Sequence, residues 1–136
     1  RPGKVDAFFK GLFETALRPQ EMITAVRVPT ADKATRVGFA ELARRHGDYA
    51  IVGLAANARS NGKRLADVRL AFFGVGNTPV RAKKAEAALA SGDIDAAVKA
   101  LDLDPNDDVQ ATAKTKKHLA GVLLRRVARQ LMEPRG

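Results

Sequence analysis

The densest group of chemically capable side chains lies in one short stretch of the chain. It reads Arg44-Arg45-His46-Gly47-Asp48-Tyr49, so two guanidiniums, an imidazole, a carboxylate and the chain's only tyrosine occur in consecutive positions. Glycine permits a backbone that a β-carbon would forbid, and a tyrosine ring offers a flat apolar face with a polar tip. Two interpretations are open: an ordinary turn whose tyrosine packs and hydrogen-bonds, or a bend that presents side chains to a ligand.

A second segment, Gly74-Val75-Gly76, precedes an expected helix. Amide groups at a helix start favour anions, so a phosphate-binding loop is conceivable. Pro79 stands where the third glycine of a GxGxxG motif would be, and no P-loop lysine follows. A structural turn is therefore the favoured interpretation.

No other residue set indicates catalysis or metal binding. The two histidines, His46 and His118, are far apart in the sequence, and the chain has no cysteine. A hydrolytic triad would need Ser60 or Ser91, both in expected turns. The acidic segment Asp102–Asp108 lacks the glycine and closing glutamate of a calcium loop. We therefore predict no catalytic residue and no metal site.

Composition favours one compact domain, residues 1–136, with a single core. The chain is 46% hydrophobic and 5% aromatic, so Ala, Val and Leu should dominate this core. The absence of cysteine excludes disulfides and iron–sulfur ligation by this chain and is compatible with a reducing cytoplasm. No run of about 18 apolar residues predicts a membrane span. The start, Arg1-Pro2-Gly3-Lys4, has neither an initiating Met nor a signal peptide, which indicates a fragment of a longer chain.

The formal net charge of +9 raises the question of an acidic partner or nucleic acid. The excess of cations gathers after Val109, in the expected last helix. No stacking aromatic pair, GxxG loop or set of zinc ligands indicates a nucleic-acid module. A solvated or protein-docking helix face is the favoured interpretation.

The first part of the chain shows three weaker patterns. Apolar residues three and four apart predict a short lead-in helix over Val5–Leu17, weakened by Gly11, so that residues 1–18 would form a linker. Alternation over Met22–Val28, stopped by Pro29, predicts a strand. Arg36–Ala43 also suits a strand, with a helix as the open alternative.

The strongest prediction is a β-hairpin. Ala50–Arg59 and Leu65–Phe73 are β-type runs, and Asn61-Gly62 between them is typical of a type I′ turn, which needs two positive φ angles. Both runs should lie in one antiparallel sheet.

Helical patterns follow the hairpin. Thr78 and Pro79 predict the start of a helix that ends at Ala90 before Gly92. Asp93 should cap a short helix to Leu101. The last helix, Val109–Met132, should bury Leu119, Val122, Leu123 and Val127 and turn its cations outward. The predicted fold class is α+β: a small antiparallel sheet of about three to four strands with about three helices on one face.

Four blocks in order resemble a known family, the C-terminal domain of the FAD-binding medium (flavoprotein) subunit of carbon monoxide dehydrogenase-type molybdenum hydroxylases, within the xanthine dehydrogenase family. The blocks are FFKGLFETAL with EMITAVRVP at 8–29, RRHGDYAIV at 44–52, GVGNTPVRA at 74–82 and KHLAGVLLRR at 117–126.

The resemblance implies a role in electron transfer. FAD would be held mostly by an N-terminal domain that is absent from this chain, and this domain would cover the isoalloxazine. By position in the GDYA segment, Tyr49 would lie against the flavin, with Asp48 and Gly47 as close neighbours. Electrons would pass from [2Fe–2S] clusters through FAD to an external acceptor.

The implied partners are an iron–sulfur small subunit and a molybdopterin large subunit, in a heterotrimer or its dimer. The assembly would be an oxidoreductase of the cytoplasm, either free or at the inner face of the membrane, in which this domain is not itself catalytic. Carbon monoxide, an aldehyde, a purine or an aromatic heterocycle all stay open as substrates. The alternative function is a basic module, without a cofactor, that docks an acidic protein or nucleic acid.

Overall fold

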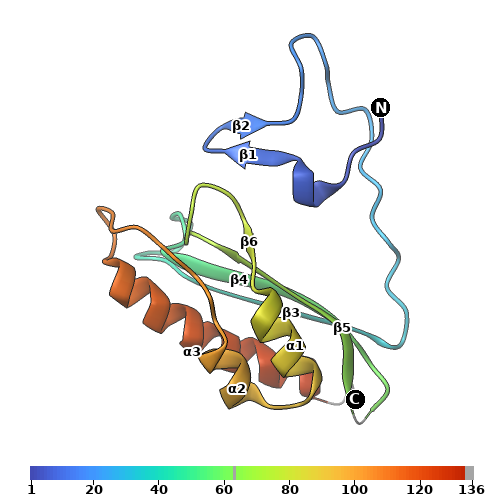
Figure 1. Ribbon diagram of the computed structural model, residues 1–136, viewed down its shortest axis with the longest axis vertical. Helices are drawn as coiled ribbons and strands as arrows, with labels where there is room; N and C mark the ends of the chain where they lie inside the picture. The colour runs from blue at the N-terminus through green and yellow to red at the C-terminus, as the bar shows by residue number, and fades with distance from the viewer. Residues whose placement is uncertain (63, 134–136) are drawn as a thin grey trace.

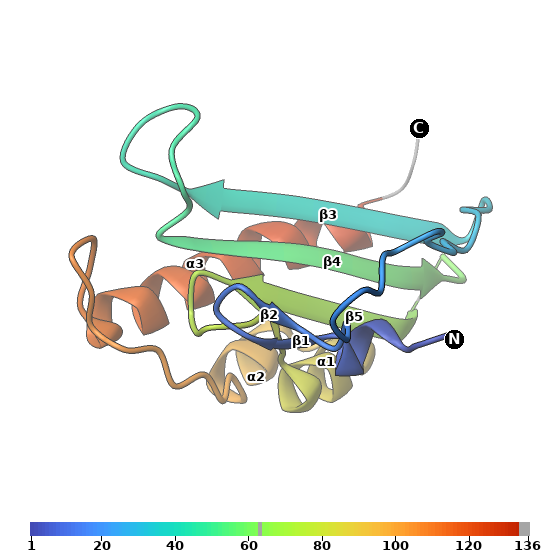
Figure 2. The same cartoon turned by 90° about the horizontal axis from the view of Figure 1, so that it is seen from above.

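The structure is a computed structural model that describes residues 1–62 and 64–133. Four antiparallel strands form the main sheet in the order β3-β4-β5-β6. Their bounds are Thr35–Leu42 for β3, Val52–Ser60 for β4, Leu65–Phe73 for β5 and Val80–Arg81 for β6. The helices α1 (Lys83–Ala90), α2 (Ile94–Lys99) and α3 (Ala113–Met132) all lie on one face of the sheet (Figures 1 and 2). The predicted α+β class is confirmed.

The core fills the space between the sheet and the helices. Because side chains alternate along a strand, every second residue of β4 points to the helices, and Val52, Leu54 and Ala58 are fully buried. From β5, Leu70 and Phe72 join them, and α3 supplies Leu123, Leu124, Val127 and Leu131. We call this side the covered face and the opposite side the open face.

The predicted hairpin is confirmed, but its turn differs from the prediction. β4 and β5 pair antiparallel, and the last pair is Ser60 with Leu65. The connection therefore spans residues 61–64 rather than two residues. Gly62 has a φ of +88°, whereas Asn61 is not among the residues with positive φ, so a type I′ turn at Asn61-Gly62 is excluded. Lys63 lies outside the described residues.

The third strand prediction also holds. Of the predicted Arg36–Ala43 run, all but Ala43 belongs to β3. β3 pairs with β4 along its whole length, and the helical alternative is wrong. β3 is an edge of the sheet, and its burial alternates between the two faces.

The lead-in helix over Val5–Leu17 is wrong. A short 3₁₀ turn, η1 (Val5–Ala7), is followed by two short paired strands, β1 (Phe9–Gly11) and β2 (Glu14–Thr15). The reversal between them places Phe13 at a φ of +56°, which no α-helix accommodates. This small hairpin lies over the open face (Figure 1).

The strand over Met22–Val28 is also wrong. This segment has no strand assignment, and Met22, Ile23, Val26 and Val28 are exposed. An alternating pattern becomes a strand only where a neighbouring strand supplies hydrogen bonds, and among residues 1–62 and 64–133 no strand pairs with it.

Two helices begin later than predicted. Val80 and Arg81 first pair with Phe72 and Ala71 as β6, so α1 starts at Lys83 and its N-cap is Ala82 rather than Thr78. The last helix starts at Ala113, because the Thr112 side chain accepts a hydrogen bond from the Thr115 amide. The Asp93 cap is confirmed, since its carboxylate accepts from the Ala96 amide at 2.8 Å.

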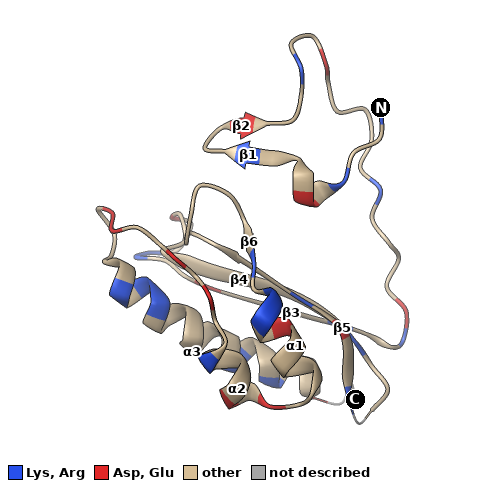
Figure 3. Cartoon of the chain, viewed as in Figure 1, with Lys and Arg blue, Asp and Glu red and all other residues tan. Residues whose placement is uncertain are grey.

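The prediction for the faces of α3 is confirmed in its main part. Leu123 and Val127 are buried, and Leu119 and Val122 are partly buried. Most cations of α3, whose positions along the helix are coloured in Figure 3, are exposed. Lys116 is the exception, with 5% of its surface exposed. Within the described residues, no helix is long and apolar enough to cross a membrane.

Candidate functional site: a braced bend at one end of the sheet

The segment singled out by the sequence forms the bend between β3 and β4, residues 43–51. Its base is closed by a hydrogen bond from the Ile51 amide to the Leu42 carbonyl at 2.7 Å. At its tip, Gly47 has a φ of +78°, the left-handed conformation that glycine tolerates best. A β-carbon built on Gly47 would meet no atom within 4 Å, so open space lies beside it.

Asp48 braces the bend from within. One oxygen of its carboxylate accepts a hydrogen bond from the Tyr49 amide at 2.9 Å, and the other lies 3.6 Å from Nε of Arg45. The Asp48 amide in turn donates to the Arg45 carbonyl at 3.2 Å. The side chain of Asp48 is therefore engaged in shaping the bend that carries Tyr49.

Tyr49 is 86% exposed, although aromatic side chains are normally well buried. The tip of the bend is therefore exposed rather than packed against the domain. Gly47, Asp48 and Tyr49 are consecutive in the sequence, and the structure leaves the Tyr49 ring exposed, with open space beside Gly47. His46 lies on the same bend and is exposed.

The glycine-rich segment after β5 contacts this bend from the other side. A β-carbon on Gly74 would lie 2.6 Å from the Ile51 carbonyl oxygen and 3.0 Å from that of Ala50. Gly74 also has a φ of +76°. This close backbone approach explains the glycine and supports a structural turn. The β3–β4 bend, the β5–β6 loop and the segment before α3 gather at one end of the sheet (Figures 1 and 2).

Beside the bend, two aromatic rings stack on the open face. Phe39 of β3 and Phe73 of β5 have ring centroids 5.9 Å apart with planes inclined by 21°. Between their strands lies Gly53, whose β-carbon would come within 2.0 Å of the Phe73 ring. Sequence reasoning missed this pair; the glycine inside a strand run was the available signal, because it often marks a close approach.

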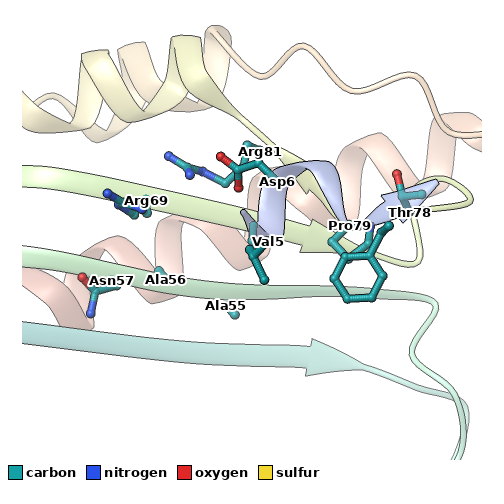
Figure 4. A pocket seen from close by; sticks show the side chains of 11 residues that line it. Val5, Asp6, Ala55, Ala56, Asn57, Arg69, Thr78, Pro79 and Arg81 are labelled. Carbon is teal, nitrogen blue, oxygen red and sulfur yellow. The ribbon is translucent and has the colours of Figure 1, made fainter. Parts of the chain in front are cut away.

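A hollow of about 370 Å³ lies further along the open face, beneath the N-terminal hairpin (Figure 4). Its walls include Val5, Phe9 and Ala71, and its charged residues are Asp6, Arg69 and Arg81. None of Gly47, Asp48 and Tyr49 lines it.

The ion pair between Arg81 and Glu86, beside this hollow, has a structural role. Arg81 binds both carboxylate oxygens of Glu86, at 2.6 and 2.8 Å, and the Leu70 amide donates to the same carboxylate at 2.8 Å. Burial acts to raise the pKa of Glu86, but the hydrogen bonds from Arg81 and Leu70 outweigh it, so that this pKa is lowered. The hydrogen bond to Glu86 raises the pKa of Arg81, and the nearby Asp6 adds to this effect.

Can these residues hold a flavin? An exposed ring beside a glycine with free space suits contact with one side of a planar group. Gly47, Asp48 and Tyr49 line neither the hollow beneath the N-terminal hairpin nor a smaller one between α2 and α3. The bend therefore fits one side of a flavin rather than a complete binding site. Across residues 1–62 and 64–133, no group of three or more His, Cys, Asp or Glu side chains could hold a metal ion.

Comparisons with known proteins agree with this fold. Residues 38–131 match the model of the CO dehydrogenase flavoprotein C-terminal domain. The chain is 30% identical over 126 residues to the carbon monoxide dehydrogenase medium chain of Afipia carboxidovorans, covering 88% of this chain and 44% of that relative. It is 31% identical over 128 residues to the caffeine dehydrogenase subunit beta of a Pseudomonas species, covering 89% and 43%.

A solved structure supports the same assignment. The carbon monoxide dehydrogenase of Hydrogenophaga pseudoflava superposes with a TM-score of 0.85 at 30% identity, covering 93% of this chain and 46% of that one. The chain thus spans less than half the length of the relatives it matches. With a family match over most of its residues, this chain belongs to the CO dehydrogenase flavoprotein C-terminal domain family.

Proposed function

We propose that this chain is the C-terminal domain of the flavoprotein subunit of a molybdenum hydroxylase, and that the Gly47–Tyr49 bend covers one side of the FAD isoalloxazine. The observation that carries the proposal is an exposed, braced tyrosine in a chain of this family. An N-terminal domain outside this chain would supply most of the affinity for FAD. When bound, FAD would supply the electron-accepting chemistry between the iron–sulfur clusters of a partner and an external acceptor.

The residues of this chain have three roles in that proposal. The Tyr49 ring packs against the flavin and keeps water from that side. Asp48 fixes the Tyr49 backbone through its hydrogen bond to the amide, and Gly47 supplies the left-handed backbone at the tip. A single aromatic contact contributes about 1 kcal/mol, so Tyr49 adjusts the flavin environment more than it retains the cofactor.

The proposed assembly is a multisubunit oxidoreductase of the cytoplasm. Its other members would be an iron–sulfur small subunit and a molybdopterin large subunit, as a heterotrimer or its dimer, and this chain would contribute no catalytic residue. The substrate would bind the large subunit, so the sequence of this chain does not define it.

The exposed cations of α3 are candidates for contact with those subunits. Arg125 pairs with Asp95 of α2 and is thus engaged within the domain, whereas Arg126 and Arg129 are exposed on the same helix. Charge reversal at Arg126 should weaken assembly, and more so at low salt, because salt screens exposed charges. Arg125→Glu serves as the comparison, since it should first disturb α2. Assembly that is unchanged at both salt levels would leave these cations a role in solubility alone.

The test of the flavin-facing role uses the FAD-loaded subunit with Tyr49→Ala and, as the matched control, Tyr49→Phe. We expect Tyr49→Ala to shift the flavin midpoint potential or to speed reoxidation, while FAD content stays mostly intact. Tyr49→Phe retains the ring and should stay close to the unaltered subunit. An unchanged potential together with an unchanged reoxidation rate in Tyr49→Ala would contradict the proposal.

A further inference from the structure

The Arg44 side chain extends from the bend to a segment that is distant in the sequence. Its Nη2 atom donates to the Val109 carbonyl at 2.6 Å and lies 3.4 Å from the Gln110 carbonyl. These acceptors are 65 and 66 residues away in the sequence, in the segment between α2 and α3. A side chain that spans two segments in this way restricts the motion of each relative to the other.

The segment that Arg44 reaches is itself held in place by Asp108. One carboxylate oxygen of Asp108 accepts from the Gln110 amide at 2.9 Å and from the Ala111 amide at 3.0 Å. The other accepts from Nζ of Lys116 at 2.5 Å. The carbonyls that receive the Arg44 guanidinium are thus fixed by the residue directly before them.

Lys116 connects this arrangement to the core. Lysine is seldom buried without a partner, yet Lys116 is 5% exposed, and Asp108 is the carboxylate that it meets. The ammonium and the two amides hold the pKa of Asp108 down, at about 2, so this carboxylate is charged at neutral pH. Further along α3, Leu123 and Leu124 are fully buried, so the helix that carries Lys116 is anchored in the core.

We propose that Arg44 is a positioning residue, and that Arg44, Asp108 and Lys116 together hold the Gly47–Tyr49 bend at a fixed place above α3. We call these three residues the Arg44 clamp. On the other arm of the bend, the backbone of Gly74 lies close to the carbonyls of Ala50 and Ile51, so the bend is bordered on both arms. That the Arg44 clamp positions Tyr49 against a bound flavin rests on the proposed function. That it restricts the motion of the bend does not.

The composition of the chain makes the motion of the bend directly measurable by fluorescence. Tyr49 is the only tyrosine, and there is no tryptophan, so the intrinsic fluorescence of the 136-residue chain reports on the bend alone. Time-resolved anisotropy of that emission separates nanosecond motion of the bend from tumbling of the whole molecule. No flavin is needed for this experiment.

The variants are Arg44→Met, Arg44→Lys and, at the far end of the clamp, Asp108→Asn. The matched control is Arg36→Met. Arg36 lies near the far end of β3, the strand that leads into the bend, and also donates to backbone carbonyls, those of Lys33 and Thr35. We expect a roughly twofold larger amplitude of nanosecond motion in Arg44→Met and Asp108→Asn, and no change in Arg36→Met. Arg44→Lys keeps a donor and should recover part of the rigidity.

Unaltered anisotropy in a folded Arg44→Met chain overturns the clamp, and an equal change in Arg36→Met does so as well. If Asp108→Asn does not fold, Arg44→Met and Arg44→Lys still decide the question, because the Arg44 side chain is exposed and its replacement should not unfold the domain. In the FAD-loaded subunit, Arg44→Met should shift the flavin potential in the same direction as Tyr49→Ala. A looser bend with an unchanged potential supports the clamp and counts against the flavin-facing role of Tyr49.

Discussion

The two faces of the β3–β6 sheet are built from neighbouring residues of the same strands, yet they serve different purposes. On the covered face, Leu54 and Phe72 are completely buried against the helices. On the open face, Val37 and Phe39 stay 59% and 58% exposed. The covered face holds the hydrophobic core and therefore most of the folding free energy. Side chains on the open face and on the bend beside it contribute less to stability, so their identities can serve contacts with other molecules instead.

The largest effect should come from truncating the covered face. We expect Leu54→Ala to lower the free energy of unfolding by about 2–5 kcal/mol, because it removes buried methyl groups and leaves a cavity. Val37→Ala, on the open face, should cost less than about 1 kcal/mol. Urea denaturation of both variants measures the difference. Equal losses would show that the open face is as important to stability as the core.

A smaller loss should follow from Glu86, which joins α1 on the covered face to the backbone of β5 and to Arg81. Glu86→Gln should cost about 2 kcal/mol, because it weakens charge-assisted hydrogen bonds at a buried site. Lys84→Gln is the control, since the Lys84–Asp102 pair is exposed on both sides and should contribute less than about 1 kcal/mol. Unfolding curves of both variants at neutral pH test this ranking.

The same residue gives a pH dependence with a defined sign. The folded-state pKa of Glu86 is lowered from its ordinary value of 4.5, so its contribution is fully present above that value. It should be lost as the pH falls from 4.5 through the lowered pKa. The difference in stability between the unaltered chain and Glu86→Gln should therefore shrink on acidification. A difference that grows toward low pH would contradict this assignment.

Sequence alone predicted the elements whose partners are adjacent in the chain. The β4–β5 hairpin and the Asp93 cap depend on residues a few positions apart, and periodicity and capping rules describe such contacts well. The Val5–Leu17 and Met22–Val28 patterns failed because a period does not say whether a surface is present to bury the apolar side chains.

The role of Gly47, Asp48 and Tyr49 stays a prediction, and the contacts around their bend could be predicted only in part, for a related reason. The Gly47–Tyr49 bend was recognisable from its residue types. The approach of Gly74 to Ile51 and the reach of Arg44 to Val109 depend on strand register and on segments far apart in the sequence. Such contacts follow from the tertiary fold, which no local pattern encodes.

A third variant alters the open face without touching the core. In Gly53→Ala the new methyl group would overlap the Phe73 ring, which must then move away from the sheet. We expect a loss of about 1–3 kcal/mol, typical of an overpacked site. In a Phe73→Ala background the overlap is gone, and the same substitution should be close to neutral. Comparable losses in both backgrounds would show that the Phe73 ring is not the cause.

The smallest effect concerns the Phe39–Phe73 pair, and it measures how much the open face stabilises the domain by itself. The rings are stacked at 5.9 Å with Phe39 more than half exposed, so a double-mutant cycle of Phe39→Ala and Phe73→Ala should give a coupling of about 0.5–1.5 kcal/mol. Repeating the cycle in Gly53→Ala, where the Phe73 ring is displaced, should abolish the coupling. A coupling that survives there would mean that the rings interact away from the sheet surface. A coupling much larger than this range would mean that the Phe39–Phe73 pair stabilises the domain as a core contact does, and the contrast between the two faces would no longer hold.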